Sequence, residues 1–212
     1  MLKDLNIVEF ADETASNSPA PGGGSIAALN ASMAASLLAM VAGLTVGKKK
    51  YMDVSERMEE LQTELNKYKD EFVEGIDRDA NSFNGVMDAM KLPKETDEEK
   101  ELRSEKIQEG YKAAIEVPLG LGTKVTELYD YARELAEKGN SNAITDVAVA
   151  LLNIKAAVEG AFLNVIINLN SLKNQDYRRE LEEKMDSVRK IVDKNHEEIM
   201  KIVDEKLVWY IF

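Results

Sequence analysis

The feature that most constrains this fold is a long helical pattern that begins at Met52 and is stopped by Pro93. A helix of about forty residues would span about 60 Å. No segment shows the strict alternation of apolar and polar residues that is typical of half-buried strands. We therefore predict an all-α protein built from long helices. The apolar heptad positions of the pattern are Met58, Leu65, Phe72 and Val86.

The rest of the chain is predicted to form further helices separated by clear stop signals. Thr96 and Glu99 can form a capping box, and Pro118 is expected to kink or break the helix that follows. The elements predict an antiparallel multi-helix bundle in a single domain over 1–207, with a separate tail at 208–212. The predicted helices are 3–15, 25–46, 52–92, 96–138, 143–169 and 175–207.

Three of these helices differ in the environment that their composition predicts. Residues 25–46 carry a small side chain at every turn, which favours a central helix with close neighbours. Residues 143–169 are apolar almost all round and should be buried, whereas 175–207 is charged and amphipathic, as in an outer helix. In the short first helix, Leu5, Val8 and Phe10 are expected to face the core.

Charge and composition exclude several classes of function. The chain has 212 residues, a net charge of −12, no cysteine and one histidine, His196, which we expect on the surface. Affinity for nucleic acid or anionic membranes is therefore not expected, nor is a disulfide, a thiolate nucleophile or a histidine-cluster metal site. The start lacks a signal-peptide core, and no apolar run reaches the roughly 20 residues that cross a bilayer. We expect a cytoplasmic protein.

A glycine-rich loop at 17–25 precedes the predicted central helix. Its glycines permit positive φ and close approach, and Ser25 stands where an N-cap is expected. The backbone N–H groups of such a helix start can bind an anionic or polar ligand. An ordinary capped loop is the alternative. The loop residues that we predict to bind a ligand are Pro21, Gly22, Gly23, Gly24 and Ser25.

A carboxylate interrupts the apolar row of the long helical pattern. Asp79 lies seven residues after Phe72 and seven before Val86. Burial would raise its pKa and make it a candidate general acid or base near neutral pH. The alternative is a structural ion pair with a lysine from another helix.

Polar and small residues share one face of the predicted buried helix, because they follow one another at steps of three and four. Such a face suits the wall of a cleft for a flat polar ligand, or equally a tight helix–helix contact with amide hydrogen bonds. The stripe comprises Asp146, Ala150, Asn153, Ala157, Gly160, Asn164 and Asn168.

Basic residues gather at two predicted helix ends of this acidic chain. They could hold an anionic ligand, although solvated charges near helix ends are the common alternative. Met87 and Met90 fit core positions better than cofactor contacts. The basic set is Lys48, Lys49, Lys50, Lys94 and Arg103.

The ordered motifs of the chain resemble the cyclodeaminase/cyclohydrolase family of folate enzymes. The resemblance covers about residues 5 to 170 and implies an all-helical homodimer that binds a folate, without a metal or any cofactor beyond tetrahydrofolate as substrate. The matching segments are Pro19–Ser25, Asp79–Phe83, Leu92–Lys94, Thr96–Arg103, Ile107–Gln108, Val117–Leu119, Gly139–Asn142 with Asp146, and Gly160–Val165.

The resemblance also implies a reaction and a set of site residues. Because the family's transferase domain does not accompany this chain, hydrolysis of 5,10-methenyltetrahydrofolate to 10-formyltetrahydrofolate is favoured over formimidoyltetrahydrofolate cyclodeamination. Either the lysines or the helix start after the glycine loop would hold the anionic glutamate tail, which is expected to be polyglutamylated. A non-catalytic helical scaffold is the alternative of another class. The implied catalytic residues are Asp79, Asp146 and Lys94, and the implied binding residues are 21–25, Lys48, Lys49, Arg103, Asn140, Asn142 and Asn164.

Overall fold

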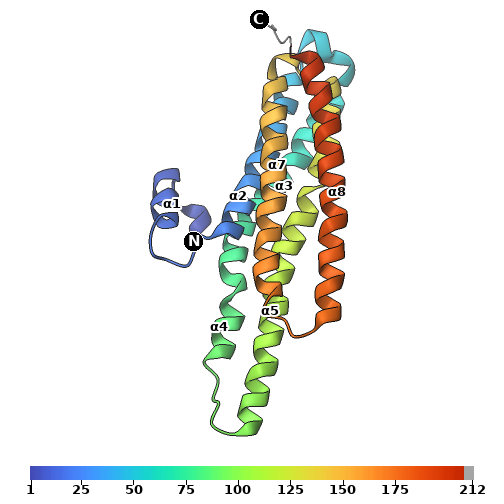
Figure 1. Ribbon diagram of the computed structural model, residues 1–212. Helices are drawn as coiled ribbons and strands as arrows, with labels where there is room; N and C mark the ends of the chain where they lie inside the picture. The colour runs from blue at the N-terminus through green and yellow to red at the C-terminus, as the bar shows by residue number, and fades with distance from the viewer. Residues whose placement is uncertain (208–212) are drawn as a thin grey trace, which may run out of the picture.

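The computed structural model describes residues 1–207 as an all-helical antiparallel bundle, which confirms the predicted fold class (Figure 1). The predicted tail at 208–212 lies outside the described residues. Three short 3-10 helices, η1 to η3, accompany eight α-helices. The elements are η1 (Leu2–Asp4), α1 (Ile7–Thr14), α2 (Gly23–Thr45), η2 (Lys49–Val54), α3 (Ser55–Ser82), α4 (Asn84–Met90), α5 (Asp97–Val125), α6 (Leu128–Lys138), η3 (Ser141–Ala143), α7 (Ile144–Leu169) and α8 (Gln175–Lys206).

Helix α2 is central, as its small side chains predict, and packs between α3 and α7. A Cβ placed on Gly75 of α3 would lie 3.3 Å from the Cβ of Ala28. A Cβ on Gly160 of α7 would lie 3.2 Å from the Cβ of Ala27. Glycine and alanine therefore let three helix backbones approach closely at the middle of the bundle.

The long helix predicted over 52–92 is divided in the structure. The chain forms η2, then α3, and α3 ends at Ser82 before α4 begins at Asn84. The turn at Phe83 lies within Asn-Ser-Phe-Asn-Gly, whose residues have low helix propensity. Apolar periodicity continues across this turn, so the pattern alone did not locate the break.

Pro118 does not interrupt its helix. Helix α5 continues from Asp97 to Val125, and the break before α6 falls at Thr126 and Glu127. Pro118 is buried, so tertiary contacts compensate for its missing N–H donor. The break occurs where the Thr126 hydroxyl donates to the Thr123 carbonyl at 2.7 Å and competes with the helical ladder. The capping box is confirmed, since the N–H of Glu99 donates to Thr96 Oγ1 at 3.2 Å.

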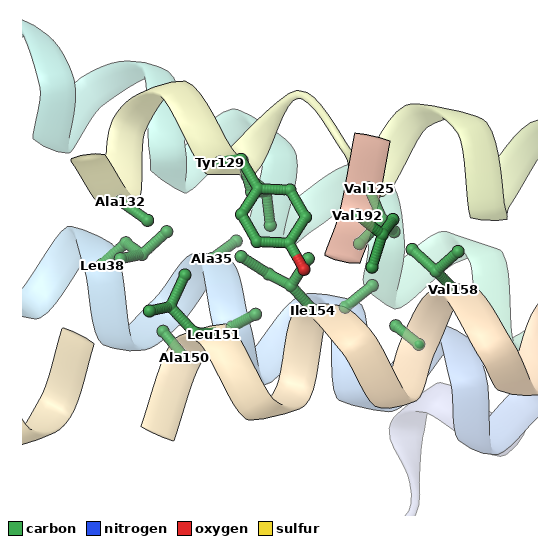
Figure 2. Packing of buried hydrophobic residues seen from close by; sticks show 14 of the residues in the cluster. Ala35, Leu38, Val125, Tyr129, Ala132, Ala150, Leu151, Ile154, Val158 and Val192 are labelled. Atoms are coloured by element: carbon green, nitrogen blue, oxygen red, sulfur yellow. The ribbon is translucent and has the colours of Figure 1, made fainter. Parts of the chain in front are cut away.

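The core lies between α2, α6, α7 and the adjoining helices. Tyr129 of α6 is 1% exposed and lies among aliphatic side chains that include Leu38 of α2 and Ile154 of α7 (Figure 2). Two methionines expected in the core are instead exposed, because α4 projects beyond the main bundle with α5 (Figure 1). These are Met87 and Met90. His196, expected on the surface, is half-buried on α8.

Several apolar residues expected in the core are exposed. Helix α1 stands to one side of the bundle and contains no buried residue, and Val8 is 68% exposed (Figure 1). Leu5 and Phe10 are half-buried. Helix α7 is buried on one side only, and Leu163 on its other side is 61% exposed. The physical reason is that α7 packs against α2, α5, α6 and α8, and no other helix within residues 1–207 covers its outward side.

The length and hydropathy of α2 and α7 also correct the expectation that no segment reaches membrane-spanning length. Helix α2 has 23 residues with a mean hydropathy of 1.7, and Ser141–Leu169 has a mean hydropathy of 1.6. By length and composition alone both could cross a bilayer. Their sides that face α3, α5, α6 and α8 are buried within the protein.

Candidate active site

A cavity of about 180 Å³ lies at the N-terminal end of α2, between α2, α3, α5 and α7. The loop before α2 forms one wall, the end of α3 with the turn residue Phe83 forms a second, and α5 and α7 form the others. Its walls combine backbone edges, two amides, one carboxylate and an aromatic ring. The lining residues are Pro19, Ala20, Gly22, Gly24, Asp79, Ala80, Ser82, Phe83, Ala114, Pro118, Asn164, Ile167 and Asn168.

Gly24 is required by close approach and not by backbone conformation. A Cβ at this position would lie 2.0 Å from Oδ1 of Asp79. Among residues 1–207 a positive φ occurs only at Gly47, so the positive φ expected in the glycine loop is not observed. The N-cap is Gly22 and not Ser25, because α2 begins at Gly23, two residues earlier than predicted.

The side chain of Ser25 holds the carboxylate that the sequence singled out. Ser25 is fully buried in the first turn of α2, and its Oγ lies 3.0 Å from Oδ2 of Asp79 and 3.1 Å from the carbonyl oxygen of Ile76. The Asp79 carboxylate therefore faces the N-terminus of α2, where the helix dipole favours negative charge. The anion at this helix start is a side chain of the protein itself.

Burial raises the pKa of Asp79 above the ordinary range of a carboxyl group, and hydrogen bonds from the side chain and backbone of Ser25 oppose the rise. Within residues 1–207 no basic side chain forms an ion pair with Asp79, so the alternative of a structural salt bridge receives no support. A half-buried carboxylate that lines a cavity without a cationic partner is suited to accept a proton or to stabilise a bound cation.

Only the C-terminal part of the polar stripe on α7 reaches the cavity. Asn164 and Asn168 line it, and a Cβ on Gly23 would lie 3.2 Å from Nδ2 of Asn164. That amide donates to the carbonyl of Gly160 in its own helix at 2.9 Å, not across a helix interface. The small residues of the stripe instead pack against α2. The stripe is therefore partly a cavity wall and partly a close helix contact.

Five implied site residues lie at the opposite end of α2. Asn140 donates from Nδ2 to the carbonyl of Leu44 at 3.0 Å and accepts from the N–H of Asn142 at 3.1 Å. Because α2 has 23 residues, this end lies about 33 Å from the cavity. Within one chain the straight helices keep these residues away from Asp79. The five are Lys48, Lys49, Asn140, Asn142 and Asp146.

The remaining basic residues lie on the α4–α5 hairpin. Lys94 is in the turn at its tip, and it does not line the cavity. Arg103 of α5 donates from Nε and Nη2 to the carbonyl of Met90 at 3.2 and 3.1 Å. Arg103 therefore joins the end of α4 to α5 through hydrogen bonds, and its contact with a ligand stays a prediction.

The cavity also includes an aromatic residue that was not among the predicted site residues. Phe83, which the resemblance includes only as the last residue of the segment Asp79–Phe83, lies at the turn between α3 and α4 and lines the cavity. Its ring packs edge-on against Tyr111 at a centroid distance of 5.9 Å. The low helix propensity of the flanking residues is the signal that could have located it. Residues 1–207 contain no group of three acidic or histidine side chains placed to hold a metal ion.

The environment of Asp79 makes a prediction for Ser25. Replacing Ser25 by alanine removes a hydrogen bond to the carboxylate, so the pKa of Asp79 should rise further. If Asp79 must be ionised to act, the acidic limb of the activity–pH profile should move to higher pH, with activity largely recovered at alkaline pH. A Ser25→Ala profile that overlays the wild type would contradict this role. Ser36→Ala, which removes a hydroxyl bonded only to its own helix, is the matched control.

Comparison with known proteins places these observations in a family. A family model described as Formiminotransferase-cyclodeaminase matches residues 6–187. The chain is 37% identical to a methenyltetrahydrofolate cyclohydrolase of Methylorubrum extorquens over 207 residues, which cover 98% of this chain and 100% of the relative. It is 39% identical to a formimidoyltransferase-cyclodeaminase of Gallus gallus. That match covers 81% of this chain but only 32% of the relative.

A solved structure has the same fold. The crystal structure of a formiminotetrahydrofolate cyclodeaminase from Thermotoga maritima superposes with a TM-score of 0.85 and 28% sequence identity. The match covers 99% of this chain and 100% of that one. Both the bundle and its chain length are therefore shared with an independently determined structure.

Proposed function

Because this chain belongs to the formiminotransferase-cyclodeaminase family, we propose that it is a folate enzyme that hydrolyses 5,10-methenyltetrahydrofolate to 10-formyltetrahydrofolate. One observation carries the choice of reaction. The relative named methenyltetrahydrofolate cyclohydrolase matches this chain from end to end, whereas the Gallus gallus relative is about three times as long as the match.

The chemistry of this substrate fits the Asp79 cavity. Methenyltetrahydrofolate carries a cationic amidinium carbon between two nitrogens. Binding it beside the Asp79 carboxylate would supply the cation that this group lacks and lower its pKa. Water then adds to the amidinium carbon while the carboxylate accepts one water proton. The tetrahedral adduct opens by breaking one C–N bond, which leaves the formyl group on the other nitrogen and releases one proton overall.

The other cavity residues suit the remainder of the folate. Asn164 and Asn168 offer amide groups to a flat polar ring, and Phe83 offers an aromatic surface. A cavity of about 180 Å³ is smaller than the roughly 300–1,000 Å³ of pockets that enclose whole drug-sized ligands. We therefore propose that the reacting ring system binds inside the cavity and that the glutamate tail extends outside it. We also propose that this tail is polyglutamylated. We further propose that the protein is a cytoplasmic homodimer and needs no cofactor beyond its folate substrate.

The second candidate is formimidoyltetrahydrofolate cyclodeamination, which the likeness to the Thermotoga maritima enzyme favours. In that reaction the second nitrogen attacks the formimino carbon, and ammonia leaves. The same carboxylate would assist proton transfer, so the cavity serves either reaction.

One assay separates the candidates. The purified chain is mixed with methenyltetrahydrofolate, and loss of the methenyl chromophore is compared with the buffer rate. We expect a large acceleration that Asp79→Asn removes. With formimidoyltetrahydrofolate, appearance of the chromophore together with ammonia would instead identify a cyclodeaminase. Inactivity of the intact protein with both substrates would reject the proposed function.

A further inference from the structure

Pro118 interrupts the hydrogen-bond ladder of α5 at the wall of the Asp79 cavity. A proline has no N–H, so the carbonyl oxygen of Ala114, four residues earlier, lacks its regular helical donor. Ala114 and Pro118 lie one turn apart, and both line the cavity together with Asp79. The interrupted part of the ladder therefore faces the cavity that contains the candidate general base.

The carbonyl oxygen of Ala114 is left with room to accept a hydrogen bond from outside its helix. Ala114 is 1% exposed, and a buried carbonyl without a partner is costly. Further along α5 a hydroxyl helps, since Thr123 Oγ1 donates to the carbonyl of Leu119 at 2.8 Å. The residues three and four positions after Ala114 are Val117 and Pro118, whose side chains have no donor. A donor inside the cavity, a water or a bound ligand, is therefore expected to bond with this oxygen.

A second, smaller cavity lies on the other side of Asp79 and Pro118, between α3 and α5. Asp79 and Pro118 line both cavities, so these two residues separate one cavity from the other. The volume of the smaller cavity is about 30 Å³, and its lining includes Glu71, Arg78 and Lys124. Since a water needs roughly 10–15 Å³ of such volume and polar surroundings, this cavity has room for water but not for a ring system. Water can thus stay beside Asp79 and Pro118 while a folate ring fills the larger cavity.

We propose that the Ala114 carbonyl and the Asp79 carboxylate together hold the water that attacks the one-carbon unit, and that Pro118 keeps this carbonyl free. One O–H of the water donates to Asp79 and the other donates to Ala114. A lone pair of the water oxygen is then directed at the amidinium carbon. The assignment of this water as the attacking one rests on the proposed function, whereas the water site itself does not.

The carbonyl orients the water and leaves the stoichiometry of the reaction unchanged. The water oxygen forms the new C–O bond, Asp79 takes one proton, and the second O–H bond stays intact while it donates to Ala114. Two acceptors fix the water more closely than one, so less orientational freedom is lost on the way to the transition state. In the cyclodeaminase alternative, the same oxygen would accept an N–H of the leaving ammonia. Ala114 thus acts through its carbonyl, and Pro118 is a positioning residue.

Pro118→Ala tests the free carbonyl, because alanine restores the N–H that completes the ladder at Ala114. We expect kcat to fall about 10- to 100-fold with KM nearly unchanged, as for the loss of one transition-state contact. The midpoint of chemical denaturation should not fall, since the helix gains a hydrogen bond and loses an interior proline. The acidic limb of the activity–pH profile should stay in place, whereas Ser25→Ala moves it. A fully active Pro118→Ala enzyme would overturn the proposal.

An ester at position 118 separates the effect of the N–H from that of the proline ring. Lactic acid incorporated in place of Pro118 has the methyl side chain of alanine but an oxygen where alanine has the N–H, so the Ala114 carbonyl stays free. We expect this protein to recover most of the kcat that Pro118→Ala loses, although both lack the ring. If the ester is as impaired as Pro118→Ala, the loss belongs to the missing ring and the proposal is wrong.

Glycolic acid in place of Gly120 is the matched control for the ester bond. Gly120 lies in the same helix but lines neither the Asp79 cavity nor the smaller one. Its ester removes an N–H from α5 without freeing a carbonyl at the Asp79 cavity. This protein should therefore keep the kcat of the wild type.

The water site is tested without any folate. A high-resolution crystal structure of the ligand-free wild type should show a water within hydrogen-bond distance of both the Ala114 carbonyl and the Asp79 carboxylate. In Pro118→Ala the bond to Ala114 should be lost, and in the ester at position 118 it should be kept. A wild-type structure with no water at this position would overturn the proposal. If the wild type turns over neither folate, the proposed function fails, while these structures still decide whether the water site exists.

Discussion

Replacing Asp79 by asparagine should lower kcat by about 10²- to 10⁴-fold without unfolding the chain. Asparagine keeps the shape of the side chain and can still accept the hydrogen bond from Ser25, but it cannot accept a proton. The loss should therefore appear in kcat with little change in KM, as in the removal of a transition-state interaction. Steady-state kinetics on methenyltetrahydrofolate measure it.

The same substitution should also change how stability depends on pH. Relative to the wild type, the free energy of unfolding of Asp79→Asn should increase as pH rises. The folded-state pKa of Asp79 is raised above its unfolded value, so the folded state binds more protons between the two pKa values. The free energy of unfolding that this group contributes is therefore present below its unfolded pKa and is lost as pH rises through the folded pKa. Asparagine does not titrate, so the variant does not lose this free energy. The difference in free energy of unfolding between Asp79→Asn and the wild type should therefore increase between the two pKa values of Asp79 and then level off.

The control distinguishes Asp79 from an ordinary acidic residue. Asp88→Asn alters an exposed carboxylate of α4 that pairs with Lys91, and it should leave both kcat and the pH dependence of stability nearly unchanged. A folded Asp79→Asn enzyme with near-normal kcat would assign the proton transfer to another group. Loss of the folded state, with the surviving protein fully active, would make Asp79 a structural residue.

Replacing Gly24 by alanine should cost both activity and stability. The new Cβ would lie 2.0 Å from Oδ1 and 2.5 Å from Cγ of Asp79, so the carboxylate must move away from the N-terminus of α2. Displacing it from the Ser25 hydroxyl disrupts the proposed catalytic geometry, and we expect a decrease in kcat of at least about 100-fold. Overpacking of this kind also lowers the free energy of unfolding by about 1–3 kcal/mol.

Gly120→Ala is the matched control for this overpacking. Gly120 lies inside α5, and a Cβ there would meet no atom within 4 Å. Since alanine has the higher helix propensity, this variant should be more stable by up to about 1 kcal/mol and fully active. Chemical denaturation and kinetics compare the two variants directly. A Gly24→Ala protein that matches Gly120→Ala in both measurements would show that Asp79 can shift without consequence.

Local patterns in the sequence were sufficient for the fold class and for the most unusual residues. The capping box at Thr96, the helix end at residue 138 and the central position of residues 25–46 follow from short-range rules, because caps and helical periodicity depend on neighbours in the chain. Asp79 was identifiable because a carboxylate in an apolar heptad row has no local explanation. Its contact with the glycine loop required two segments 54 residues apart to meet.

Other features depended on three-dimensional packing. Pro118 stays inside α5 because its tertiary contacts offset the missing hydrogen bond, which no local pattern records. The composition of α7 predicts burial on all sides, but only the packing of the other helices decides which side is covered, and Leu163 on the outer side is 61% exposed. Residues from motifs that resemble one family can also lie far apart in the folded chain. The length of α2 sets a distance of about 33 Å between its two ends, and the tertiary structure places Asp79 at one end and Asn140 at the other.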